Sequence, residues 1–102
     1  MKFFLLSDNI DTQMGLRLAG IEGVVIHTED EIMENMKTAL NDETIGIILI
    51  THKLVSLCKD YIYDLKLNNK IPLIVEIPDR HSTYSAGDTI MNYIKEAIGV
   101  KF

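Results

Sequence analysis

The stretch Thr44–Ile50, which reads TIGIILI, decides the fold of this 102-residue chain. Its apolar residues follow one another without the polar alternation of a strand that has one face in water. Leu73–Val75 repeats this pattern later in the chain. Both faces of such strands must be buried, which is typical of a parallel sheet covered by helices on both sides.

Similar short runs alternate with stretches of helical periodicity along the rest of the chain. The predicted strands are Lys2–Leu6, Gly23–His27, Thr44–Ile50 and Pro72–Ile77, and the predicted helices are Asp11–Ala19, Glu29–Asn41, His52–Asn68 and Ala86–Ile98. This βαβαβαβα order predicts an α/β fold with a small four-stranded parallel sheet in the order 2-1-3-4 and helices on both faces. Such a sheet is Rossmann-like or flavodoxin-like. We expect one domain over residues 1–102, with a sheet core in 1–78 and a loop and amphipathic C-terminal helix in 79–102.

The composition excludes several classes of protein. A share of 47% hydrophobic and 25% charged residues is that of a globular chain. The formal net charge of −5 disfavours nucleic acid as a partner, because phosphate binding needs clustered Lys and Arg. All apolar runs are far shorter than the roughly 18 residues of a membrane-spanning helix, so we expect no direct membrane insertion. The single cysteine, Cys58, excludes an intrachain disulfide and a cysteine-based zinc site.

Several residues predict local structure. Thr28 followed by Glu31 predicts a capping box at the start of the second helix. Gly20 suits a left-handed residue at the end of the first helix, and Gly23 suits the turn into the second strand. Met36 is expected in the core.

Polar residues at the strand ends form the candidate cleft. Ligands of open parallel sheets bind beyond the carboxyl ends of the strands, here near Ser7, Asp8, Thr51 and His52. Asp8 and His52 could form an acid–base pair with Ser7 as the nucleophile. Helix capping by Asp8 or Asn9 after the first strand, and by Thr51 after the third, accounts for the same residue types and is the favoured interpretation.

The sequence lacks the residues that phosphate binding, receiver phosphorylation or a shared metal site would require. Residues 7–11 contain no glycine to bring backbone N–H groups near a phosphate. A receiver domain needs an aspartate after the third strand, where this chain has Thr51 and His52. In the order 2-1-3-4, His27 and His52 follow strands about 10 Å apart, too far to share one metal ion, and His81 lies in a later loop. The sequence therefore predicts no catalytic residue, cofactor or metal.

Glu76 lies near the end of an otherwise apolar strand and is expected to be partly buried. A buried carboxylate needs a hydrogen-bond or cationic partner, and Arg80 is the candidate. Such a pair would fix the chain where it leaves the sheet.

Three segments resemble the F subunit of V-type and A-type rotary ATPases, over nearly the whole chain. Asp11–Ile21 is similar to the family's Asp-Thr start and Leu-Ala-Gly-Ile helix end. Tyr93–Val100 is similar to its closing helix. The third segment is the corner Pro72–Pro78 with the downstream residues Arg80, Tyr84, Asp88 and Ile90.

The resemblance implies a non-catalytic subunit of the central stalk, or rotor, in which ATP chemistry belongs to the large A and B subunits. Its implied partners are the coiled coil of the D subunit and the C/d-type adaptor to the membrane ring. The implied role is to help couple ATP hydrolysis or synthesis to H⁺ or Na⁺ transport, from a cytoplasmic position peripheral to the membrane.

Tyr and Arg are common interface anchors, and a helix on a coiled coil buries an apolar stripe. On this basis the residues expected to bind the D subunit are Pro78, Arg80, Tyr84, Ile90, Met91, Ile94 and Ile98.

Two alternatives stay open at this point. One is a small-ligand-binding or enzymatic domain that uses the cleft of Ser7, Asp8, Thr51 and His52. The other is a signalling receiver without its phosphosite, which would bind a partner through its fourth helix and the adjoining strand.

Overall fold

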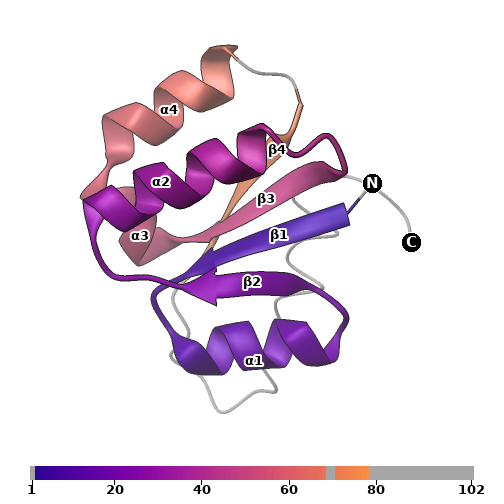
Figure 1. Ribbon diagram of the computed structural model, residues 1–102. Helices are drawn as coiled ribbons and strands as arrows, with labels where there is room; N and C mark the ends of the chain where they lie inside the picture. Colours follow the sequence, from indigo (N-terminus) through magenta and orange to yellow (C-terminus); the bar gives the residue numbers. More distant parts are fainter. Residues whose placement is uncertain (1, 69–70, 79–102) are drawn as a thin grey trace.

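The computed structural model describes residues 2–68 and 71–78 (Figure 1). The elements are, in order, β1 (Lys2–Ser7), α1 (Ile10–Leu18), β2 (Glu22–Val25), α2 (Glu29–Leu40), β3 (Ile45–Thr51), α3 (His52–Leu57), α4 (Lys59–Asn68) and β4 (Leu73–Ile77). The predicted loop and helix of residues 79–102 lie outside the described residues, as do the predicted partner-binding residues from Arg80 to Ile98.

The strands form one parallel sheet in the order β2-β1-β3-β4, which confirms the predicted fold class. β1 and β3 are the central strands, and every residue of β3 is buried, as its unbroken apolar run predicts. α1 covers one face of the sheet, whereas α2, α3 and α4 cover the other (Figure 1). None of the helices in the described ranges has the length and apolarity needed to cross a membrane.

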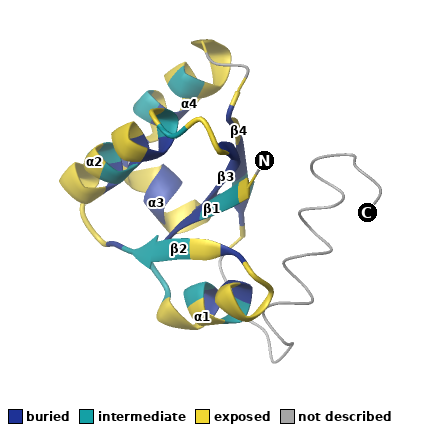
Figure 2. Ribbon diagram, turned by 45° about the vertical axis from the view of Figure 1, so that its right-hand side comes forward, coloured by how far each residue is buried: buried dark blue, intermediate teal, exposed yellow. Residues whose placement is uncertain are grey.

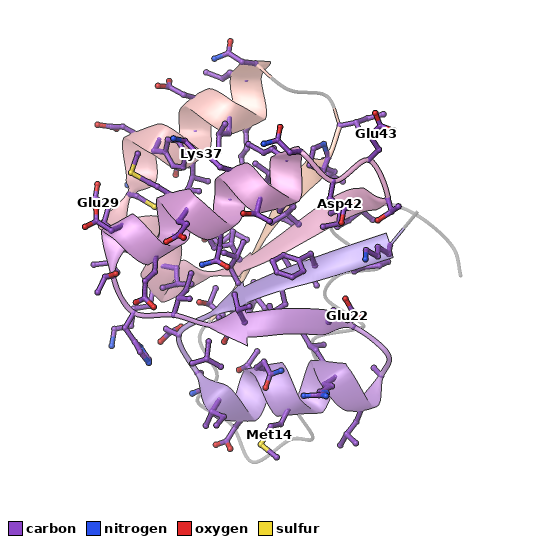
Figure 3. All side chains as sticks on the ribbon, in the orientation of Figure 1. Met14, Glu22, Glu29, Lys37, Asp42 and Glu43 are labelled. Atoms are coloured by element: carbon purple, nitrogen blue, oxygen red, sulfur yellow. The ribbon has the colours of Figure 1, made fainter. Side chains whose placement is uncertain are left out.

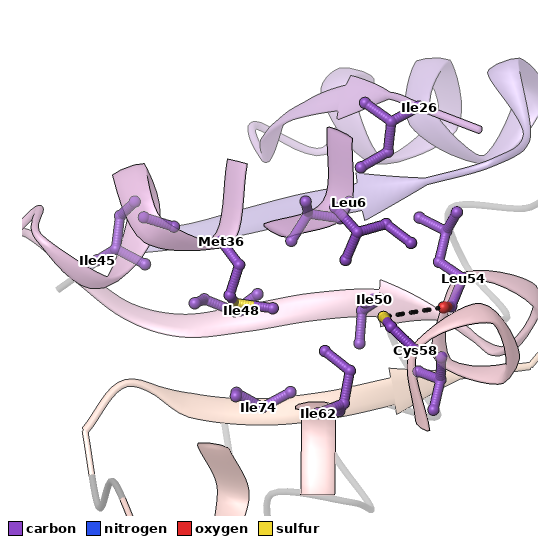
Figure 4. Packing of buried hydrophobic residues seen from close by; sticks show 13 residues of the cluster. Leu6, Ile26, Met36, Ile45, Ile48, Ile50, Leu54, Cys58, Ile62 and Ile74 are labelled. Carbon is purple, nitrogen blue, oxygen red and sulfur yellow. Dashed lines mark hydrogen bonds between the residues drawn. The ribbon is translucent and has the colours of Figure 1, made fainter. Parts of the chain in front are cut away.

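The larger part of the core lies between the sheet and α2–α4 (Figure 4). Alternate residues of β3, such as Ile48 and Ile50, meet Met36 of α2 and Ile62 of α4, and all four are fully buried. The opposite face contributes Leu5 and Leu49 to a second cluster with Leu16 of α1. Burying one such side chain contributes about 1.5–3 kcal/mol, so these two layers hold the sheet in place.

The prediction of a single helix over His52–Asn68 is wrong, because the helix breaks at Cys58. This residue has φ −142° and ψ 49°, and its N–H donates to the Val55 carbonyl at 3.2 Å. The Cys58 thiol donates to the Leu54 carbonyl at 3.5 Å (Figure 4). Leu54, Cys58 and Ile62 all stay buried against the sheet, so the apolar pattern continues through the break in the backbone.

Side chains cap the first two long helices. The Asn9 carboxamide oxygen accepts from the N–H groups of Asp11 at 2.8 Å and Thr12 at 3.1 Å. The capping box of Thr28 and Glu31 is confirmed, with both reciprocal hydrogen bonds present. These bonds satisfy N–H groups that have no partner within the helix.

The two glycines near β2 act differently from each other. Gly20 has φ +89°, as predicted for the residue that ends α1. Gly23 lies within β2 and not in the turn before it, which corrects the prediction. A Cβ atom at this position would lie 2.6 Å from the Leu5 Cβ and 2.8 Å from the Leu5 carbonyl oxygen. Gly23 is therefore needed for the close approach of β2 to β1.

Candidate functional site

The carboxyl edge of the sheet brings Asp8 and Thr51 of the predicted cleft together, whereas His52 pairs with Glu76 and Ser7 bonds within its own loop. Ser7 and Thr51 end β1 and β3, and Asp8 and His52 follow them. Asp8 is paired with Thr51, and His52 is paired with Glu76 of β4. The hydrogen bonds therefore run between neighbouring strands.

The first pair ties the end of β1 to the end of β3. The Thr51 hydroxyl donates to Oδ1 of Asp8 at 2.7 Å and accepts from the Asp8 N–H at 3.3 Å. Thr51 is the residue before α3, but its side chain makes no capping bond to that helix. The predicted capping by Asp8 or Asn9 is confirmed for Asn9, whereas the predicted capping by the Thr51 side chain is wrong.

Ser7 is fully buried, and its hydroxyl is used by its own loop. It donates to the Asn9 carbonyl at 2.8 Å and accepts from the Asn9 N–H at 2.9 Å. The hydroxyl proton is thus held by a backbone carbonyl. A serine nucleophile needs a base to accept that proton, so this geometry does not form the Ser7–His52–Asp8 relay of the enzymatic alternative.

The second pair joins α3 to β4. Nδ1 of His52 lies 3.0 Å from Oε2 of Glu76, and their side chains are 55% and 34% exposed. Glu76 is partly buried, as predicted, but the partner seen here is His52, and the predicted partner Arg80 lies outside the described residues. Glu76 shares a sheet face with Ile74, two residues earlier, and α3 begins on that face. Strand order and residue alternation together could have indicated this pair from the sequence.

The amino edge of the sheet carries a weaker set of charge contacts. Nζ of Lys2 lies 3.9 Å from carboxylate oxygens of both Glu22 and Asp42. Hydrogen bonds from the side chain and backbone of Thr44, together with the Lys2 charge, lower the pKa of Asp42. These groups are exposed, so the contacts contribute little to stability. Across the described ranges, no group of three or more His, Cys, Asp or Glu residues is arranged to hold a metal ion.

Pro78 is the one residue of the predicted partner surface that the described ranges include. It is exposed and directly follows β4. The His52–Glu76 pair holds the strand two residues earlier. The pairing of β4 with β3 also extends to Ile77, so the chain leaves the sheet directly after the last paired residue.

The parallel sheet and its internally bonded carboxyl edge define a small Rossmann-like α/β module whose polar edge residues join strands to one another. Residues 4–94 match the family described as ATP synthase (F/14-kDa) subunit. The chain belongs to this family.

Curated relatives agree with the match over almost their full lengths. The F subunit of the A-type ATP synthase of Methanocaldococcus jannaschii is 35% identical over 101 residues, which cover 98% of this chain and 97% of the relative. The corresponding protein of Thermococcus kodakarensis is 35% identical, with coverage of 99% and 97%. That of Methanothermobacter thermautotrophicus is 33% identical, with coverage of 89% and 87%. This chain is thus an accessory subunit of a rotary ATPase complex and not its catalytic enzyme.

Proposed function

We propose that this chain is a rotor subunit of the central stalk, which binds the coiled coil of the D subunit and turns with it. The family match over residues 4–94 carries this proposal. The hydrogen-bonded carboxyl edge supports it, because Asp8, Thr51, His52 and Glu76 join strands there. A rotor part must transmit torque, and cross-links between strand ends stiffen the sheet that would do so.

The proposed contact with the D subunit begins at Pro78. The exposed proline follows a strand whose end is fixed by the His52–Glu76 pair, which gives the downstream segment a rigid base. The proposed contact residues are Pro78, Arg80, Tyr84, Ile90, Met91, Ile94 and Ile98. Arg and Tyr are enriched at interface anchor positions, and the isoleucines have the spacing of one helical stripe.

We further propose a peripheral, cytoplasmic position between the D subunit and the C/d-type adaptor of the membrane ring. In this position the chain would help couple ATP hydrolysis or synthesis to H⁺ or Na⁺ transport. The absence of a membrane-spanning helix among the described residues is compatible with this position.

Calorimetry of the full chain with the purified coiled coil of the D subunit tests the proposed interface. Ile94→Asp places a charge on the apolar stripe and should weaken binding at least tenfold. Asn92→Asp changes the polar side of the same segment and should leave the affinity within twofold of wild type.

If the wild-type protein does not bind this coiled coil, the proposed function is wrong. Unchanged affinity of Ile94→Asp would remove that residue from the interface. If Ile94→Asp does not fold, Tyr84→Ala takes its place, with the same tenfold loss expected and the same conclusion from unchanged affinity.

A further inference from the structure

We draw no further inference here: the strongest candidate, the exposed apolar row of Ile10, Met14 and Leu18 on the outward side of α1 (Figure 3), carries nothing because nothing in the structure shows what covers it.

Discussion

Glu31 illustrates how a single exposed residue fixes the start of a helix. Its carboxylate accepts from the N–H groups of His27 and Thr28, both at 3.2 Å, and from the Thr28 hydroxyl at 3.1 Å. These hydrogen bonds stabilise the ionised form, with the His27 N–H as the largest cause, and so they lower the pKa of Glu31.

This lowered pKa predicts a pH-dependent contribution to stability. A carboxylate with a lower pKa in the folded state stabilises that state above its ordinary pKa, which is 4.5 for Glu31, and loses the effect as the pH falls through the lowered value. Glu31→Gln removes the titration. Wild type should therefore be more stable than Glu31→Gln at about pH 7, and the difference should shrink as the pH falls through the lowered pKa of Glu31.

Thermal unfolding of both proteins from about pH 7 down through the pKa of Glu31 measures the difference, while the titration of groups that do not interact with Glu31 cancels. Thr38→Ala, which changes an exposed hydroxyl on the same helix, should differ from wild type by an amount that does not depend on pH. A constant difference between wild type and Glu31→Gln would contradict the assigned hydrogen bonds.

Features of single residues could be predicted where they depend only on residues nearby in the sequence. The capping box and the left-handed Gly20 follow from a few neighbouring residues. The role of Gly23 could not be inferred in this way, because it depends on the distance to Leu5 in a different strand. The pairs Thr51–Asp8 and His52–Glu76 likewise join residues that are 43 and 24 positions apart.

At the scale of elements, α3 and α4 act as two short helices on one apolar surface. The break at Cys58 lets both pack against the sheet, and Ile62 of α4 remains fully buried. Periodicity predicted which residues face the core, but it did not predict the break. The hydrophobic pattern reports the direction of side chains and continues even where the backbone hydrogen bonds stop.

Ile62 and Leu67 provide a matched test of this packing on α4. Ile62→Ala removes a fully buried side chain and should lower the free energy of unfolding by about 2–5 kcal/mol. Leu67→Ala, at a position that is 83% exposed, should change it by less than about 0.5 kcal/mol. Urea denaturation measures both values. Similar effects of the two substitutions would contradict the position of α4 on the sheet.

At the scale of the whole molecule, the two faces of the sheet are covered unequally in the described part of the chain. Three helices cover one face, and α1 covers part of the other (Figure 2). The sequence predicted a parallel sheet because strands buried on both faces have a distinct apolar pattern. The strand order followed from the alternation of strands and helices and from right-handed crossovers. The interface is harder to predict, because the same isoleucine can face a sheet or a partner.

Rotation of this chain during ATP hydrolysis is the most direct test of the proposed function. Leu67→Cys offers an attachment point for a bead, since Leu67 is 83% exposed on α4. The native Cys58 is 5% exposed, and burial raises the pKa of its thiol, so the reagent should react at the introduced thiol. In surface-immobilised ATPase complexes, the proposal predicts that the bead rotates in one direction when ATP is added. A bead that does not rotate, on complexes that hydrolyse ATP and whose central stalk rotates, would contradict the proposal.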